Sequence, residues 1–140
     1  MQCPFCKIDR TKTRVIENRK QVFVALSNPR IMPGHLLVIP KRHVEKLSGL
    51  DKNEREELLD TVIHYQEKMV AKYTSGCDIR QHYRPFLKES AIKVNHVHFH
   101  LHPRELEDEL FEKSQKYERE LFDVPSQEEE VWFQKLFQEG

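Results

Sequence analysis

Long apolar runs, an excess of one charge sign and a cysteine framework are all missing from these 140 residues. No apolar stretch approaches the roughly 20 residues that span a bilayer, which argues against a membrane protein. Lysine plus arginine and aspartate plus glutamate both count 23, so no net field points to nucleic acid or to an anionic membrane as a partner. Three cysteines are too few, and odd in number, for a fold stapled by disulfides.

The N-terminal residues carry the one cysteine pair with a recognisable spacing, the C-x-x-C motif of Cys3 and Cys6. In a reducing compartment this motif indicates metal binding or redox activity. A thioredoxin-like pair follows a strand and opens a helix, and that context is absent here, so zinc is favoured. Residues 1–6 also lack the basic-then-apolar pattern of a secretory signal, and the expected location is cytoplasmic.

The order of predicted elements indicates an α+β domain with an antiparallel sheet. β-prone residues predict a hairpin of strands 13–16 and 21–26 around a turn at 17–20, and an apolar strand over 35–40. Apolar residues at steps of three and four predict a long helix from Asp51, ended by Ser75-Gly76. We expect a strand over residues 77–83 and a loop over residues 84–90. A long strand over 91–102 follows.

Beyond Pro103 the chain becomes highly charged, and the pattern predicts a helix to about Phe122 and a last helix begun by the capping box Ser126–Glu129. We therefore expect a catalytic domain over 1–104 and a helical extension over 105–140 that packs on it. The apolar residues of the last helix are the expected contacts with the body of the protein or a second subunit: Val131, Trp132, Leu136 and Phe137.

The most informative segment is the alternation His96-Val97-His98-Phe99-His100-Leu101-His102. Alternating apolar residues favour an extended chain, in which all four imidazoles lie on one face and the apolar side chains enter the core. Imidazole titrates near neutrality, so the row suits proton transfer, nucleophilic attack or metal binding. The sequence therefore predicts the functional site here.

Three motifs together resemble the histidine triad (HIT) superfamily of nucleotide hydrolases and transferases. They are the histidine row, the upstream run Pro33-Gly34-His35 to His43, and Cys3-Pro4-Phe5-Cys6, which resembles the start of the zinc-bearing microbial members. The resemblance implies a HIT-like antiparallel sheet with one long central helix, to which this chain adds C-terminal helices. It also implies a homodimer, since the family commonly pairs through its long helix and a sheet edge.

In such an enzyme His98 would attack the α-phosphorus of a nucleotide conjugate and form a nucleotidyl-histidine intermediate. Its other ring N–H needs an acceptor, which in the family is often a backbone carbonyl on the facing strand segment. His100 would position or neutralise phosphate oxygens, and His35 would support the row from the neighbouring strand. With little other fixed positive charge expected, imidazoles and backbone N–H groups would stabilise the transition state.

The resemblance also implies a structural zinc ion held by Cys3, Cys6, His43 and His96, a closed set of the kind that zinc prefers. His96 would then be a ligand and not a catalyst.

The nucleoside would lie on an apolar shelf of Phe5, Ile8 and Leu26, with Ser27 or Asn28 where the family usually has an acidic or amide residue for the ribose. The family's Gly-rich loop with Gln-Ser or Gln-Thr is missing before the row. Gln81 is the favoured substitute donor, and the alternatives are His82, Arg84, Ser90 and Lys93. His102 replaces a typically apolar residue, and would reach a polyphosphate tail or point to solvent.

The sequence thus predicts a nucleotide hydrolase or nucleotidyl transferase that acts at an α-phosphate, with dinucleoside polyphosphates and nucleoside phosphoramidates as candidate substrates. Two alternatives stay open. One is a metalloenzyme that uses His96, His98 and His100 as ligands. The other is a non-catalytic nucleotide-binding or scaffold protein, which the changes at Ser27 and in the loop keep open.

Overall fold

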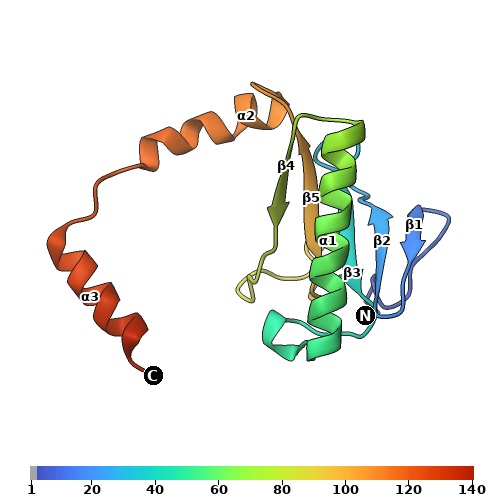
Figure 1. The fold of residues 1–140 in the computed structure, drawn as a ribbon, viewed down its shortest axis with the longest axis horizontal. Helices are drawn as coiled ribbons and strands as arrows, with labels where there is room; N and C mark the ends of the chain where they lie inside the picture. Colours follow the sequence, from blue (N-terminus) through green and yellow to red (C-terminus); the bar gives the residue numbers. More distant parts are fainter. Residues whose placement is uncertain (1–2) are drawn as a thin grey trace. The chain divides into compact units, whose positions relative to one another are not determined.

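The computed structural model describes residues 3–140, and the chain divides into two compact units, Met1–Leu106 and Glu107–Gly140. The first unit is a five-stranded sheet with one long helix, which confirms the predicted α+β class (Figure 1). All neighbouring strands are antiparallel, in the order β1-β2-β3-β5-β4. The strands are β1 (Val15–Asn18), β2 (Val22–Leu26), β3 (Leu36–Pro40), β4 (Gly76–Arg80) and β5 (Phe99–Arg104).

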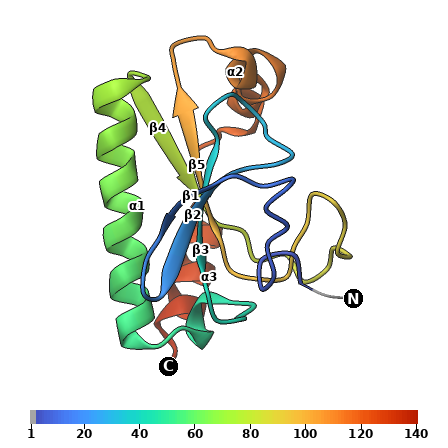
Figure 2. The same ribbon diagram turned by 90° about the vertical axis from the view of Figure 1, so that its right-hand side faces the viewer.

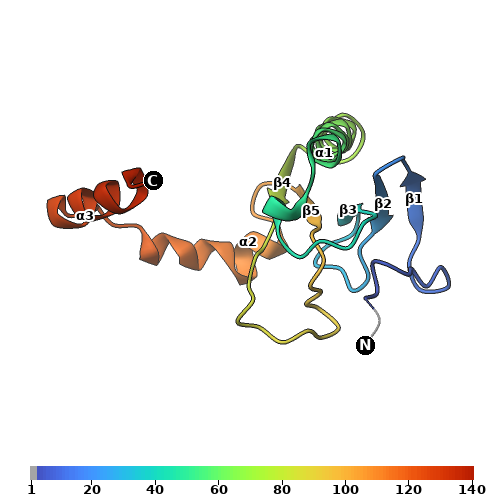
Figure 3. The same cartoon turned by 90° about the horizontal axis from the view of Figure 1, so that it is seen from below.

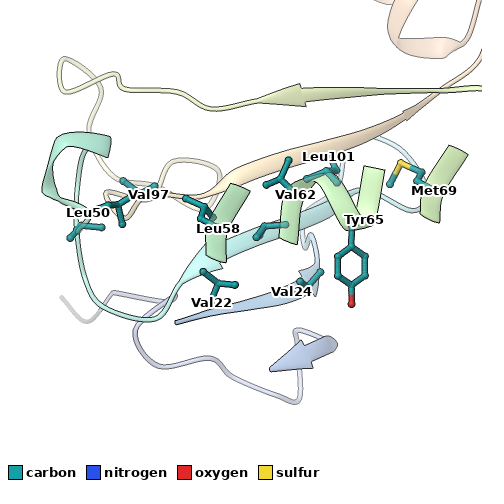
Figure 4. Close-up of a cluster of buried hydrophobic side chains, with 11 residues drawn as sticks. Val22, Val24, Leu50, Leu58, Val62, Tyr65, Met69, Val97 and Leu101 are labelled. Carbon is teal, nitrogen blue, oxygen red and sulfur yellow. The ribbon is translucent and has the colours of Figure 1, made fainter. Parts of the chain in front are cut away.

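Helix α1 (Lys52–Lys72) lies where its apolar periodicity predicts. It begins with a capping box in which the Asp51 side chain accepts from the Glu54 backbone N–H and Glu54 accepts from that of Asp51. Its buried stripe packs on the sheet and forms the main core with Val22, Val24, Val38, Val97 and Leu101 (Figure 4). The residues of that stripe are Leu58, Val62, Tyr65 and Met69.

The two faces of the sheet have different partners, as Figures 2 and 3 show. Helix α1 covers one face, and the N-terminal segment lies on the other. There Phe5 and Ile8 pack on a second apolar cluster from β2 and β3, which consists of Phe23, Ala25, Leu37 and Ile39. The chemistry-bearing residues of the N-terminus therefore lie on the face of the sheet that α1 leaves open.

The first hairpin has a shorter turn than predicted, because Glu17 and Asn18 belong to β1. The Arg19 N–H donates to the Val22 carbonyl at 2.8 Å, which closes the turn. The Tyr65 hydroxyl donates to Glu17 at 2.7 Å, and Arg19 donates to Thr61 at 3.0 Å. Both partners lie on α1, so a long-range contact extends the strand into a polar segment that local propensity assigns to the turn.

The histidine strand is also different from the prediction, because β5 begins only at Phe99. The register with β3 runs from Leu36–Leu101 to Val38–Phe99 and stops there. Continued pairing would need Pro40, which has no N–H to donate. Its carbonyl accepts from the His96 ring at 2.7 Å, so a side chain takes the position of the next ladder bond. His96 and His98 therefore lie just before the strand.

The second unit has short helices and no buried residue. The single helix predicted to about Phe122 is wrong: α2 (Glu109–Lys113) is followed by a 3₁₀ segment, Gln115–Leu121. A short helix without a packed face gains little stability, which explains the break. Helix α3 (Gln127–Gln138) begins with the predicted Ser126–Glu129 capping box. Among residues 3–140, no helix is long and apolar enough to cross a membrane.

Candidate functional site

The four imidazoles of the row lie on one face of the chain, as the alternation predicts. Ring centroids are 4.8 Å apart for His98 and His100 and 5.7 Å apart for His100 and His102. Val97 and Leu101 point the other way and are buried under α1. The alternation thus holds through residues 96–98, although these residues form no ladder.

His98 is held so that one ring nitrogen stays free. Its Nδ1–H donates to the His96 backbone carbonyl at 2.6 Å, which leaves the lone pair on Nε2. The acceptor was expected on the facing strand, and it lies instead two residues earlier on the same segment. Burial lowers the pKa of His98, so the ring is neutral at pH 7 and can act as a nucleophile.

A relay of hydrogen bonds orients His100. The Ile31 N–H donates to Nδ1 of His35 at 3.1 Å, so His35 carries its proton on Nε2. That nitrogen lies 2.9 Å from Nδ1 of His100 and donates to it, so His100 carries its own proton on Nε2. Burial lowers the pKa of His35 to about 4 and that of His100 to about 2, so both rings stay neutral. His100 therefore offers an N–H donor.

The turn before β3 places His35 in this relay. Gly34 has a φ of 84°, and a Cβ there would lie 2.8 Å from the Tyr73 ring, so no larger residue fits without a shift. His35 is buried, with 3% of its surface exposed.

His102 is not in solvent, so the reading that exposes it is wrong. Only 1% of its surface is exposed, and its ring packs edge-on against His35 with centroids 4.5 Å apart. Neither ring nitrogen has a hydrogen-bond partner among the residues that the structure describes. Pairing of β4 with β5 places polar residues of β4 beside the histidine row, and Asp78 is the register partner of His102.

That pairing also brings up Arg80, which the sequence analysis missed, and His82, which it gave only as an alternative to Gln81. Arg80 is the register partner of His100, and directly paired residues share a face of the sheet. The His82 ring lies 5.5 Å from the His100 ring. The positive charge of Arg80 contributes to the lowered pKa of His35, His82 and His102. Fixed positive charge therefore does lie beside the row, which corrects the expectation that imidazoles act alone.

Gln81, the predicted phosphate donor, is engaged elsewhere. Its side-chain amide donates to the His82 carbonyl at 2.9 Å. The signal that could have found the right residues is the period of two in Asp78, Arg80 and His82, which puts alternate side chains of a strand on one face.

A hollow of about 290 Å³ lies beside the N-terminal segment, lined in part by Phe5, Ile8 and Phe23. The Phe5 ring packs edge-on against His98 with centroids 5.0 Å apart, so one wall of the hollow contacts the His98 ring. Phe5 and Ile8 are thus brought together as predicted, Phe23 was missed, and Leu26 is not among the lining residues.

The two predicted ribose ligands are engaged in local hydrogen bonds. The Ser27 hydroxyl donates to the Pro29 carbonyl at 2.8 Å, and the Asn28 amide donates to the Lys12 carbonyl at 2.7 Å. Neither residue lines the hollow.

The four predicted metal ligands converge, with one ligand atom from each within 4.8 Å of the others. Nδ1 of His96 lies 3.3 Å from Cys3 Sγ and 3.6 Å from Cys6 Sγ, and Cys6 Sγ lies 3.3 Å from Nδ1 of His43. A tetrahedral zinc site puts sulfur and nitrogen ligands about 3.5 Å apart, so the set fits that ion. The Nε2–H of His96 donates to Pro40, which turns the lone pair of Nδ1 toward the thiols.

Comparison with known proteins defines the class. Residues 9–107 match the family model described as the HIT domain, and the chain belongs to this family. A HIT-like protein of Methanocaldococcus jannaschii is 31% identical over 73% of this chain and 78% of its own. The asymmetrical bis(5'-nucleosyl)-tetraphosphatase of Schizosaccharomyces pombe is 35% identical over 56% of this chain, which spans 42% of that protein.

Among solved structures, a zinc-bound histidine triad family protein from Mycobacterium smegmatis has a TM-score of 0.64 and 23% identity. The match covers 77% of this chain and 78% of that one. Such similarity shows the fold, and it confirms the HIT-like architecture that the motifs implied.

Proposed function

We propose that this protein is a nucleotide hydrolase or nucleotidyl transferase that acts at the α-phosphate of a nucleotide conjugate through His98. The observation that carries the proposal is the hydrogen bond from Nδ1 of His98 to the His96 carbonyl, which leaves Nε2 as a nucleophile on an open face of the sheet. The similarity to the Schizosaccharomyces pombe tetraphosphatase supports a dinucleoside polyphosphate as substrate.

The reaction has two displacements. The lone pair of Nε2 attacks the α-phosphorus, a P–N bond forms, and the leaving group departs with the electron pair of its own bond and takes a proton from solvent. Water then attacks the phosphorus, loses a proton to solvent, and the P–N bond breaks to restore the neutral ring. His100 donates its Nε2–H to a phosphate oxygen, and the base lies against Phe5 and Ile8.

The experiment compares wild type and His98→Ala on diadenosine polyphosphates and adenosine phosphoramidate and measures release of nucleoside monophosphate. We expect turnover by wild type and a loss of at least about a thousandfold in the variant, since the nucleophile itself is removed. His64→Ala, an exposed change on α1, is the matched control and keeps full activity. Nucleotide binding without turnover by folded wild type would favour the scaffold alternative instead.

The metalloenzyme alternative has less support from the geometry. Among residues 3–140, His96, His98 and His100 do not form a cluster of converging ligand atoms. Nδ1 of His96 faces the cysteines, and the Nδ1–H of His98 donates to the His96 backbone carbonyl. Unchanged metal content in His98→Ala would argue against it further.

We propose that Cys3, Cys6, His43 and His96 hold a structural zinc ion that ties the N-terminal segment to the histidine row. With four protein ligands such a site has no open position for substrate, and the ion supplies binding energy to the fold. The zinc-bound relative from Mycobacterium smegmatis supports this assignment. Free thiols at Cys3 and Cys6 suit a reducing compartment and support a cytoplasmic location.

We also propose that the protein is a homodimer and that residues 105–140 pack on the domain. Trp132, the one tryptophan of the chain, lies among the apolar residues of α3 and reports on this packing. If the tryptophan fluorescence of the native protein had its emission maximum at the same long wavelength as the unfolded chain, the packing of residues 105–140 on the domain would be contradicted.

A further inference from the structure

Three histidines outside the cysteine cluster converge on the open face of the sheet. One ring nitrogen from each of His35, His100 and His102 lies within 4.8 Å of the other two. His35 comes from the turn before β3, and His100 and His102 lie two residues apart on β5. His35 and His102 are buried, so the sheet itself sets the positions of these rings.

His102 is the member of this group that the proposed reaction does not use. Its ring has 1% of its surface exposed, and both nitrogens lack a partner within the described part of the chain. A neutral imidazole has one donor and one lone pair, and leaving either buried and unpaired destabilises the fold. The unpaired ring nitrogens of His102 therefore indicate a ligand that the protein itself does not supply.

We propose that His35, His100 and His102 form a second metal site, which binds a divalent ion of the zinc, nickel or copper type. Three imidazoles without a thiolate or a free carboxylate suit these ions better than magnesium or calcium, which prefer oxygen ligands. The Asp78 carboxylate, opposite His102 in the sheet, is already paired with Arg104. A water molecule or a substrate oxygen is left to complete the coordination.

The geometry is close to what such an ion needs. Nitrogen ligands of a tetrahedral zinc ion lie about 3.4 Å apart, and Nε2 of His35 and Nδ1 of His100 lie 2.9 Å apart. One ring nitrogen of each of the three histidines lies within 4.8 Å of the other two, so movements of about 1 Å bring three nitrogens to the separations that the ion needs. Arg80, the register partner of His100, places a positive charge nearby that weakens the affinity.

Occupancy of this site and the His35–His100 relay exclude each other. In the relay Nε2 of His35 carries the proton and donates to His100. An ion on these two atoms needs both lone pairs, so the proton of His35 must move to Nδ1 and the bond from the Ile31 N–H must break. If the proposed function holds, the bound ion therefore inhibits turnover.

The experiment measures zinc content, which does not depend on activity. Full-length protein is saturated with Zn²⁺, desalted and analysed for zinc per chain. Wild type is expected to retain two ions, and His102→Leu and His102→Asn one each. The two replacements differ in polarity, so one that fails to fold leaves the other informative. Exposed His64→Ala is the matched control and retains two.

Cobalt identifies which site is lost. Cys3→Ser combined with Cys6→Ser removes the sulfur-to-cobalt charge-transfer band and leaves a nitrogen-only spectrum, and His102→Leu removes the nitrogen-only contribution and keeps that band. One ion in wild type, or two ions in both folded His102 variants, would overturn the proposal. If wild type binds two ions and its turnover is unchanged, the second metal site stands and the inference that its ion inhibits turnover is rejected.

Discussion

Single hydrogen bonds decide what each histidine can do. His96, His98 and His100 have the same side chain, yet their hydrogen-bond partners differ. His96 donates to the Pro40 carbonyl, His98 donates to a backbone carbonyl two residues earlier, and His100 accepts from the buried imidazole of His35. Each bond selects one tautomer, and the tautomer suits each ring to the role proposed for it: metal ligand, nucleophile or donor. The chemistry of the row therefore depends on atoms that the motif does not contain.

At the residue scale, Arg80→Gln is expected to lower kcat/KM for the nucleotide conjugate about tenfold. Arg80 shares the face of His100 and supplies fixed positive charge next to the phosphate position. Steady-state kinetics at two salt concentrations measures the effect, which should shrink at high salt. Arg55→Gln, on the exposed side of α1, is the control, and an equal loss there would show that only net charge matters.

At the element scale, the start of α1 depends on one buried carboxylate. Glu54 is 2% exposed, completes the capping box and accepts from Arg42 at 2.7 and 3.0 Å. The Arg42 guanidinium is the main cause of the lowered pKa of Glu54. A carboxyl group with a lowered pKa adds stability above its unfolded pKa, and that stability is lost as the pH falls through the folded pKa.

Glu54→Gln should therefore destabilise the protein by about 1.5 kcal/mol at pH 7, since the amide keeps the cap but loses the charged pair. The difference from wild type should begin to shrink as the pH falls below the ordinary pKa of a glutamate, about 4.3, and should vanish only below the lowered pKa of the folded carboxyl group. Urea unfolding at pH 7 and at pH 3.5 measures it. A difference that stays constant with pH would mean that packing, and not charge, is responsible.

The N-terminal segment depends in the same way on its metal ligands. Removal of zinc by a chelator, or Cys6→Ser, should lower Tm, because Cys3–Ile8 then loses its bonds to His43 and His96. Thermal unfolding with and without added Zn²⁺ tests this, and Cys77→Ser, outside the cluster, is the control. An unchanged Tm after complete loss of zinc would remove the structural role.

At the scale of the whole molecule, α1 presents a second apolar stripe that the sheet does not cover. Leu59, Ile63 and Val70 follow the spacing of a helix pair and are between 44% and 58% exposed. The proposed homodimer would bury this stripe against its copy.

Leu59→Glu combined with Ile63→Glu is therefore expected to give a monomer, because like charges would meet across the two-fold axis. Sedimentation analysis of the full chain measures the mass, and circular dichroism checks the fold. Glu56→Gln, a polar change on the same helix, should leave the dimer intact. Wild type that sediments as a monomer at all concentrations would reject the dimer.

The sequence by itself determined the elements and the ligand types. The periods of α1 and of the histidine row, the Ser126–Glu129 capping box and the C-x-x-C pair of Cys3 and Cys6 were all evident from local pattern. Each depends on residues that lie close together in the chain, so no long-range information was needed. His43 and His96 joined the ligand set through the resemblance to the HIT family.

Only the tertiary structure decided which residues meet across the sheet. It placed Arg80 and His82 beside His100, buried His102, began β5 only at Phe99 and engaged Ser27 and Asn28 in local hydrogen bonds. These outcomes depend on strand order and register. β4 and β5 are separated by eighteen residues in the chain, and the pairing between them is a property of the packed core that no short motif contains.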